Sequence, residues 1–319
     1  MPVTDQLENY LSDAHSIEEQ ALVQLRAAPG IAGDASLAEI FRRHLHETEN
    51  HERRMRERLE AHGGKPSTIK EAVMKAGGAG FVMFAGSQPD TPGKLTAHAY
   101  SYEHLELAGY ELLEIVARRA GDEETALVAR RIRDEEKTMA RRLENAFDTA
   151  VDASLRQLDP DDLGRQLQKY LADAHALEAQ ALKLLEKATY IAGDPDLERI
   201  YAEHLGETRD HEGFVAKRLE ALGASPSRLK DAAMRLGAVN WGAFFKAQPD
   251  TPGKLAAFVY AFEHLEIAGY ELLKRVALRA GDEDTVQLAD RVLGDERRAA
   301  GKIAAAFDRA AEASLQAVA

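Results

Sequence analysis

Glutamates fall where apolar residues are expected in four segments of this sequence. Glu18, Glu47, Glu106 and Glu136 each lie on or beside a stripe of apolar residues with the 3.6-residue period of an α-helix. A carboxylate buried in an apolar core costs several kcal/mol unless it is paired or takes up a proton. No lysine or arginine occupies these stripes at the same level. A bound cation is therefore the simplest partner, and two divalent ions would balance the four charges.

Histidines accompany these glutamates. Glu47 and His51 are four residues apart, which puts both on one face of a helix. We therefore predict that His51 binds metal directly, and that His44 supports a ligand through a hydrogen bond. Oxygen ligands with one or two imidazoles are typical of iron or manganese sites rather than of zinc or calcium sites. Three residues on the edges of the stripes are expected either to bind metal or to support its ligands: His15, Glu103 and Glu135.

The sequence is one unit written twice, at an offset of 160 residues. QPDTPGKL at 88–95 returns unchanged at 248–255, and YEHLELAGYELL at 102–113 returns as FEHLEIAGYELL at 262–273. Every candidate residue has a counterpart. The predicted metal ligands of the second unit are Glu178, Glu207, His211, Glu266 and Glu296. The residues expected either to bind metal or to support its ligands in the second unit are His175, His204, Glu263 and Asp295.

The helices that must position these residues can be read from apolar periodicity and cap residues. We predict four long helices in each unit, and no segment shows a convincing strand alternation. In the first unit the predicted helices cover about 4–28 and 34–63, and two more begin at Thr91 and Asp122. Short turns join the first helix to the second and the third to the fourth, so each pair is expected to form an antiparallel hairpin.

The connection between the second and third helices is long, covering residues 64–91 with a short predicted helix around 67–76. A connection of this length can travel along a bundle, so the second and third helices are expected to be parallel, as in ferritin-like bundles. Aromatic residues in this connection and its repeat are expected to cover the bundle end: Phe81, Phe84, Trp241, Phe244 and Phe245. The predicted fold is all-α, with two tandem ferritin-like four-helix bundles, 1–157 and 158–319, packed as a pseudo-dimer.

Composition limits the partners. The chain has 319 residues and a formal net charge of −13, which disfavours nucleic acid and anionic membranes. It has no cysteine, so cysteine-ligated metal is excluded. The N-terminal segment has no signal-peptide pattern, and no apolar run approaches the length of a membrane span. We therefore expect a cytoplasmic protein that binds neither nucleic acid nor membrane.

Three segments resemble the bacterial YciE/YciF stress-protein family, a ferritin-like group with metal in the bundle. They are HLHETENHERRMRERLE at 44–60, EHLELAGYELL at 103–113 and DEE at 134–136. The resemblance covers nearly all of each unit and implicates the same four glutamates. The sequence departs from that family's pattern at His51, where glutamine is frequent, and at Ala140 and Ala300, where an acidic residue is frequent. Family members resemble single-unit homodimers, so this chain resembles such a dimer fused.

Three functions follow as hypotheses. The first is a dinuclear iron or manganese protein of the stress response, a possible oxidoreductase that reacts with oxygen or peroxide and holds two divalent ions in each repeat. The second is iron storage or detoxification. The third is a non-enzymatic structural or interaction protein, in which the glutamates and histidines form a metal-free network in the core. Metal content separates the third from the others, and particle size separates the second from the first.

Overall fold

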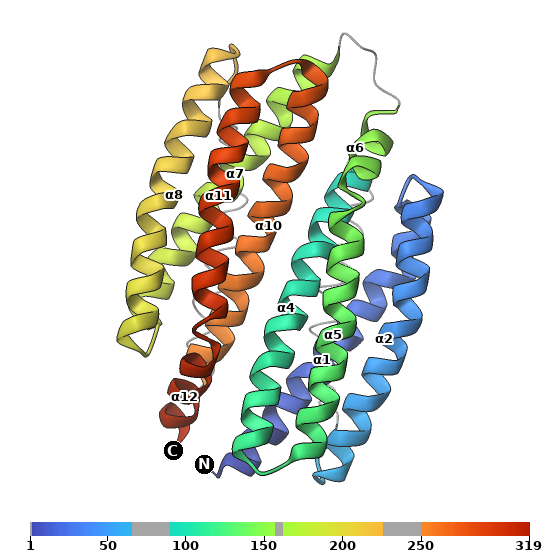
Figure 1. The fold of residues 1–319 in the computed structure, drawn as a ribbon, viewed down its shortest axis with the longest axis vertical. Coiled ribbons are helices and arrows are strands. Elements are labelled where there is room, and N and C mark those ends of the chain that lie inside the picture. Colours follow the sequence, from blue (N-terminus) through green and yellow to red (C-terminus); the bar gives the residue numbers. More distant parts are fainter. Residues whose placement is uncertain (1, 66–89, 157–161, 226–249) are drawn as a thin grey trace. The chain divides into compact units, whose positions relative to one another are not determined.

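Every regular element of the described chain is an α-helix. The computed structural model describes residues 2–65, 90–156, 162–225 and 250–319. The chain divides into two compact units, residues 1–156 and residues 157–318. The predicted all-α fold with two tandem bundles is confirmed (Figure 1). The predicted short helix at 67–76 and the predicted aromatic covers lie outside the described residues.

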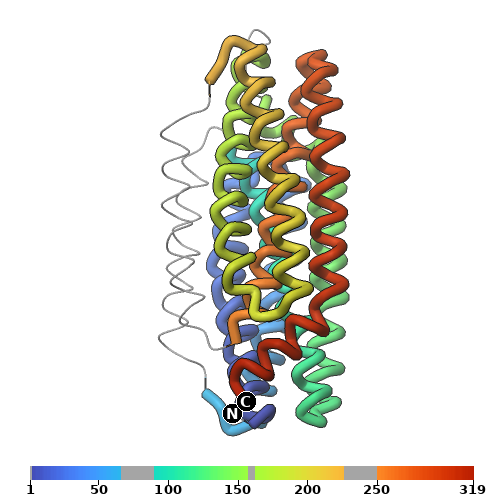
Figure 2. Tube along the Cα trace, turned by 90° about the vertical axis from the view of Figure 1, so that its left-hand side faces the viewer, coloured from blue at the N-terminus to red at the C-terminus, as the bar shows by residue number. Residues whose placement is uncertain are grey.

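Within its described residues, each unit has four long helices and one short helix. The first unit contains α1 (Val3–Ile31), α2 (Ala35–Ala61), α4 (Thr91–Arg119), α5 (Glu123–Glu144) and α6 (Phe147–Leu155). The second contains α7 (Leu163–Ile191), α8 (Pro195–Ala221), α10 (Thr251–Ala280), α11 (Glu283–Ala304) and α12 (Phe307–Val318). Figure 2 shows the long helices of the second unit running side by side along its length.

The contacts between helices fix the topology of the first bundle. α1 packs against α2 and α4, and α5 packs against α2 and α4. The turn between α1 and α2 meets the start of α4, where Gly33 lies against Pro92. α4 therefore begins at the end of the bundle where α2 begins, and the two run parallel on opposite corners. The predicted parallel arrangement of the second and third helices is confirmed, and α7, α8, α10 and α11 repeat it.

Cap residues explain where the helices begin. The carboxylate of Asp34 accepts hydrogen bonds from the backbone N–H groups of Ser36 and Leu37, and Asp122 accepts one from Thr125. Such bonds satisfy N–H groups that have no partner within the helix. Asp194 caps α8 in the same way, with Pro195 at the first helical position. The predicted starts of these helices are therefore correct.

The short helix α6 is a feature that the apolar period did not predict. After α5 ends, the chain turns at Asn145 and Ala146 and begins α6, which packs against α4. Phe147 is fully buried, and its ring meets the ring of Tyr100 edge-on with centroids 5.4 Å apart. The hydroxyl of Ser154 accepts a hydrogen bond from Gly93 N–H at 2.9 Å. α6 thus closes the end of the bundle where α4 begins.

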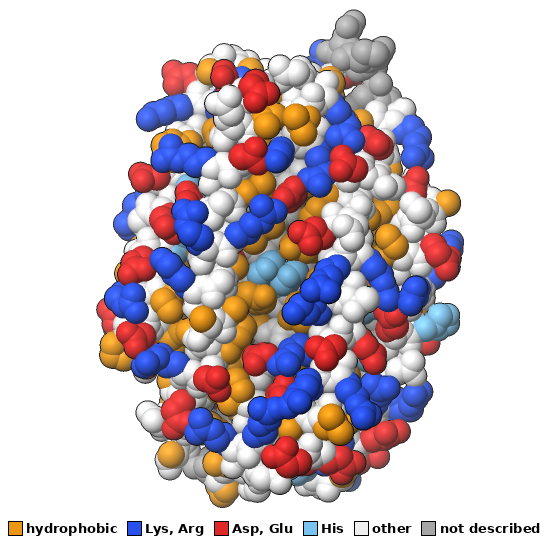
Figure 3. Space-filling view, viewed as in Figure 1, with side chains coloured by type: hydrophobic (Ala, Val, Ile, Leu, Met, Phe, Trp, Pro, Cys, Tyr) orange, Lys and Arg blue, Asp and Glu red, His pale blue; other side chains and the backbone are white. Residues whose placement is uncertain are grey.

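The core of each bundle is apolar at its ends and charged in the middle. Leu7, Phe41, Met55 and Leu143 are at most 1% exposed. The surface in Figure 3 shows basic and acidic side chains interspersed, as expected for the polar faces of amphipathic helices. None of the described helices is both long enough and apolar enough to span a bilayer.

Candidate metal centre

The inner face of α2 carries two histidines where apolar residues would be expected. His44, Thr48, His51 and Met55 follow one another at helical spacing, and each is at most 1% exposed. Both imidazoles therefore lie inside the first bundle. Glu47 lies on the flank of this face, and its side chain is 24% exposed.

Glutamates from the three other long helices meet the two histidines. Glu18 comes from α1, Glu103 and Glu106 come from α4, and Glu136 comes from α5. All four are at most 3% exposed. The sequence prediction that buried carboxylates gather on the bundle axis therefore agrees with the positions of Glu18, Glu106 and Glu136.

The first group of potential ligands surrounds His44. Its Nε2 atom lies 3.2 Å from Glu103 Oε2 and 3.4 Å from Glu136 Oε2. Glu106 adds a carboxylate oxygen, and one atom from each of these four residues lies within 4.8 Å of the others. All four residues are buried, so the group is a compact set of one imidazole and three carboxylates that could hold a cation.

The second group surrounds His51. Its Nδ1 atom lies 2.7 Å from Glu136 Oε1 and 3.9 Å from Glu18 Oε1. Glu136 therefore belongs to both groups, with one oxygen directed to each histidine. The rings of His44 and His51 lie 6.4 Å apart, centroid to centroid. The two groups of potential ligands therefore lie next to each other and share one carboxylate.

Hydrogen bonding within the described protein leaves much of this centre unsatisfied. The contacts within the two groups are close, but several do not have hydrogen-bond geometry. Buried atoms without a hydrogen-bond partner among the described residues include Glu18 Oε2, Glu103 Oε2, Glu106 Oε1, both oxygens of Glu136, His44 Nε2 and His51 Nδ1. Native cores rarely leave so many polar atoms unpaired in one place. A cation placed among them would provide the missing partner.

Burial shifts the ionisation of three carboxyl groups. Desolvation raises the pKa of Glu18 to about 8, although the nearby His51 opposes the shift. Desolvation also raises the pKa of Glu103 to about 8 and that of Glu106 well above its usual range. A metal ion that binds these carboxyl groups would therefore compete with protons.

Glu136 and the two histidines behave in the opposite way. Burial alone would raise the pKa of Glu136, but His51 and His44 outweigh it and lower the value to about 2. Burial would lower the pKa of His51, but Glu136 and Glu135 outweigh it and raise the value to about 10. The pKa of His44 is likewise raised, against burial, by Glu103 and Glu136. The negative charge of Glu136 and the positive charges of the two imidazoles thus favour one another.

The outer nitrogen of each imidazole contacts a carboxylate at the surface. His44 Nδ1 lies 3.1 Å from Glu47 Oε2, and His51 Nε2 lies 2.7 Å from Glu135 Oε2. Arg142 donates to both oxygens of Glu47, at 2.8 and 3.1 Å. Carboxylates in this position orient a metal-binding histidine through its second nitrogen.

These positions exchange two of the roles expected from the sequence. Glu47, expected as a metal ligand, lies outside both ligand groups and pairs with Arg142. His44, expected to support a ligand, directs Nε2 into the first group. The apolar stripe already contained His44 and placed Glu47 beside it. Glu207 in the second bundle likewise contacts the outer nitrogen of His204, at 2.9 Å.

The second bundle repeats the centre. His204 Nε2 lies 2.6 Å from Glu263 Oε2, and His211 Nδ1 lies 2.9 Å from Glu296 Oε1. The corresponding ligand groups are His204, Glu263, Glu266 and Glu296, and Glu178, His211 and Glu296. Asp295 takes the place of Glu135 and lies 3.2 Å from His211 Nε2. The same geometry therefore forms on two sequences that differ at many surrounding positions.

The remaining predicted residues lie apart from the centre. His15 Nε2 contacts Glu52 Oε1 at 3.0 Å, and His175 contacts Glu212 at 3.1 Å. His15 and Glu52 form a further possible cation group with Glu19. Position 179 of the second unit is alanine where the first unit has Glu19, so this group has no equivalent there.

One tyrosine belongs to the centre although the sequence did not single it out for this role. The hydroxyl of Tyr110 donates a short hydrogen bond to Glu18 Oε1, and Tyr270 donates to Glu178 Oε1 at 2.5 Å. Tyr110 lies four residues after Glu106, on the same face of α4. That spacing was the available signal. The tyrosine thus holds Glu18 Oε1, the same oxygen that lies 3.9 Å from His51 Nδ1.

The fold and the centre together define a class: an all-helical protein of two tandem four-helix bundles, each with a buried cluster of carboxylates and histidines. Comparison with known families places it further. A family described as a domain of unknown function, DUF892, matches residues 3–156 and again residues 163–316. The chain belongs to this family and contains its domain twice. No solved structure matches the chain.

Proposed function

We propose that each bundle is a dinuclear metal-carboxylate centre. The observation that carries the proposal is the shared carboxylate: Glu136 directs one oxygen to the His44 group and the other to the His51 group. The proposed ligands at one position are His44, Glu103 and Glu106, and those at the other are Glu18 and His51, with Glu136 common to both. The second bundle has the matching set His204, Glu263, Glu266, Glu178, His211 and Glu296.

The donor set supports iron or manganese. It offers carboxylate oxygens with one imidazole at each position, and it contains no sulfur because the chain has no cysteine. Four carboxylates per centre match the charge of two divalent ions. Bound iron or manganese would supply Lewis acidity and redox chemistry toward oxygen or peroxide. The protein groups would hold the ions, orient the imidazoles and exclude bulk water from the core.

We further propose that the family is the ferritin-like stress-protein group that the sequence resembles. The helix order, with α2 and α4 parallel, supports a ferritin-like bundle. The buried centre supports metal chemistry over a purely structural role, because several of its polar atoms have no hydrogen-bond partner among the described residues of either bundle. Particle size distinguishes this function from iron storage, which needs a cage.

Elemental analysis of protein purified without added metal tests the proposal. We expect up to four iron or manganese ions per chain, two in each bundle. Treatment with a chelator should remove them, and titration with Mn²⁺ should restore them. A chain that neither contains metal as purified nor binds Mn²⁺ or Fe²⁺ under anaerobic conditions would favour the metal-free network.

A further inference from the structure

A small cavity in the first bundle touches a proposed ligand directly. It lies among α1, α2 and α4, has a volume of about 20 Å³, and is bounded on one side by Glu103. Most of its lining is apolar, and the other polar side chains that line it are Gln24, His98 and Tyr102. One water molecule needs about 10–15 Å³ of such space. The cavity therefore suits a single molecule only slightly larger than water.

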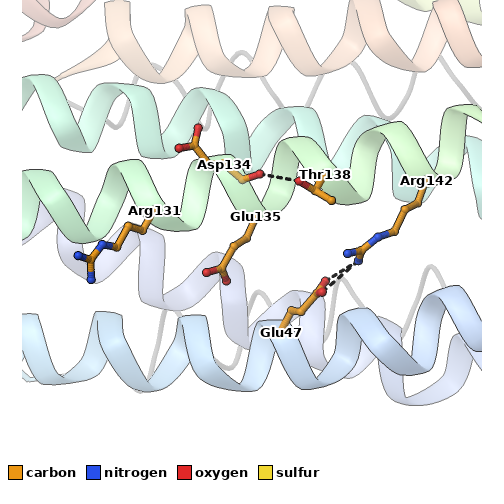
Figure 4. Close-up of a pocket in the computed structure, with 6 residues that line it drawn as sticks. All are labelled: Glu47, Arg131, Asp134, Glu135, Thr138 and Arg142. Carbon is orange, nitrogen blue, oxygen red and sulfur yellow. Dashed lines mark hydrogen bonds and ion pairs between the residues drawn. The ribbon is translucent and has the colours of Figure 1, made fainter.

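The opposite side of the centre is covered by ion pairs. Between α2 and α5, Glu47 and Glu135 stand between the surface and the two imidazoles. Figure 4 shows Arg142 on α5 bonded to Glu47 on α2. Arg43 lies 3.5 Å from Glu47, and Arg54 lies 3.6 Å from Glu135. On that side, paired side chains separate the surface from the ligand groups, whereas the cavity reaches Glu103 itself.

Gln24 provides an unused hydrogen-bond donor at the cavity. The residue is 8% exposed, and its Nε2 atom is buried with no hydrogen-bond partner among the described residues. Glu103 Oε2 is buried and likewise lacks a partner there. A buried polar atom without a partner costs about 1–3 kcal/mol. One molecule that both donates and accepts hydrogen bonds would satisfy both side chains.

The lining suits an uncharged molecule. Burial lowers the pKa of His98 to about 4, so its ring is neutral near pH 7. The Tyr102 hydroxyl is already within hydrogen-bond distance of Ile17 O and Gln20 Oε1, at 3.0 Å each. No lysine or arginine is among the residues that line the cavity. The lining therefore provides no cationic group to attract an anion.

The second bundle has no polar side chain at two of these positions. Its residues in the places of Gln24 and His98 are Leu184 and Phe258. Neither of these side chains can form a hydrogen bond, although the neighbouring ligand group keeps the same residue types. The polar lining therefore belongs to the first bundle and is not required for the ligand group to form.

Larger side chains stand at two other positions of the second bundle. Tyr201 and Val259, which are both 0% exposed, take the places of Phe41 and Ala99 in the cavity lining. Burial raises the pKa of Tyr201, and the charge of Glu263 adds to this effect. The Tyr201 hydroxyl is thus within reach of Glu263, at the place that corresponds to the cavity beside Glu103.

We propose that the cavity beside Glu103 binds one molecule of hydrogen peroxide next to the His44 group, and that Tyr201 and Val259 close the corresponding place in the second bundle. Hydrogen peroxide is small and uncharged near neutral pH, and it can donate to Glu103 while accepting from Gln24. The chemical consequence rests on the proposed function. With Fe²⁺ in the centre, each peroxide would take one electron from each of two ions, together with two protons, and would leave as two water molecules.

Binding can be tested without metal. In metal-free protein labelled with ¹⁵N at glutamine, the side-chain N–H signals of Gln24 should shift and saturate during titration with hydrogen peroxide. Those of Gln180, a buried glutamine of the second bundle, should not shift. Phe41→Tyr should abolish the shift, and the second bundle already folds with tyrosine at this position. Phe147→Tyr, which adds the same hydroxyl outside the cavity lining, should keep it.

Two results of this titration would overturn the proposal. If the Gln24 signals do not shift, the cavity holds water only. If they shift equally in the Phe41→Tyr variant, peroxide acts on Gln24 from elsewhere. Both results leave the proposed metal centre intact, because no metal is present in the experiment.

The reaction with iron provides the second test. Glu296→Gln disables the second centre and Glu136→Gln disables the first, so each background reports one bundle. After anaerobic loading with Fe²⁺, stopped-flow absorbance should show the first centre oxidised by peroxide about tenfold faster than the second, because side chains of the second bundle must move before peroxide can enter. Tyr201→Phe combined with Val259→Ala should reduce this difference without changing the number of Fe²⁺ ions bound.

Dissolved oxygen, used in a separate arm, distinguishes the two oxidants. Equal rates with peroxide in the two backgrounds would overturn the proposal. An advantage of the first centre with oxygen but not with peroxide would assign the cavity to oxygen and would also overturn it. If neither background binds Fe²⁺, the proposed function itself fails, and the titration of metal-free protein still decides whether the cavity binds peroxide.

Discussion

His51 and Glu136 face each other in the core of the first bundle, with 2.7 Å between Nδ1 and Oε1. Each holds the other in its charged form, since the pKa of His51 is raised and that of Glu136 is lowered against the effect of burial. The other oxygen of Glu136 lies 3.4 Å from His44 Nε2. One carboxylate thus lies against both imidazoles.

Removal of the shared carboxylate should therefore eliminate metal binding. We expect the double variant Glu136→Gln, Glu296→Gln to bind no Mn²⁺, because each ligand group loses its common anionic oxygen. The matched variant Glu47→Gln, Glu207→Gln should keep the number of bound ions and lose about 10- to 100-fold in affinity, because these residues only orient the imidazoles. Elemental analysis and Mn²⁺ titration measure both. Full metal content in the first variant, or none in the second, would reverse the assigned roles.

Metal should also stabilise the fold. Several carboxylate oxygens of the metal-free core lack a hydrogen-bond partner among the described residues. An ion that binds the folded state but hardly binds the unfolded chain adds stability by mass action. At a concentration about 1,000 times Kd the gain is about 4 kcal/mol for one site. Differential scanning calorimetry of chelator-treated protein should show a clear rise in Tm on addition of Mn²⁺. An unchanged Tm would indicate that the carboxylates are already satisfied by protein donors.

Tight turns offer a test of the fold that is independent of metal. Gly33 has φ of 68°, and a Cβ atom there would lie 2.7 Å from the Pro92 ring. Gly63 has φ of 79°, with nothing within 4 Å of the same position. Gly63→Ala should cost about 1–2 kcal/mol from backbone strain alone, and Gly33→Ala should cost more because the start of α4 must also move. Urea unfolding of the two variants measures the difference, and equal costs would contradict the close packing of α4 on this turn.

Apolar periodicity was sufficient to predict most of the fold. The stripes, the aspartate caps and the long connection after α2 indicated four helices per unit, and the parallel pair α2 and α4 followed from the length of that connection. α6 was missed because its nine residues, Phe147–Leu155, are too few to establish a helical period beside α5. Its position depends on the packing of Phe147 on Tyr100, which is a tertiary contact.

Position on the apolar stripe predicted which glutamates are buried together in the bundle. Glu18, Glu106 and Glu136 were found because they interrupt an apolar face. The pairing of Glu47 with Arg142 could not be predicted, because the two residues lie 95 positions apart in the sequence. His44 was on the stripe, but sequence alone does not show which ring nitrogen faces inward. The role of Tyr110 depends on a contact with α1 that no local pattern encodes.

The pH dependence of stability should differ between the metal-free and metal-loaded forms. In the metal-free form, Glu18 and Glu103 have pKa values of about 8, raised mainly by burial, and His51 has a pKa of about 10, because neighbouring carboxylates outweigh its burial. All three bind more protons in the folded state than in the unfolded chain between pH 6.5 and 8. Their stabilising contribution is therefore lost as the pH rises through this window.

Other groups do not reverse this trend above pH 6.5. The lowered pKa of Glu136 acts only at acidic pH. Burial lowers the pKa values of His98 and His104 to about 4, so these residues weaken the fold only as the pH falls below about 6.5. The free energy of unfolding of chelator-treated protein should therefore fall by more than about 1 kcal/mol per pH unit between pH 6.5 and 8.

Metal should reverse the slope, because ions displace the protons that the folded core otherwise holds. The loaded folded state then binds fewer protons than the unfolded chain does at its histidines, and metal affinity rises with pH. Urea unfolding at about pH 6.5, 7.2 and 8 measures both slopes, once with chelator and once with a fixed excess of Mn²⁺. Equal slopes in the two conditions would show that no proton is exchanged for metal, and they would place the ions outside the His44 and His51 groups.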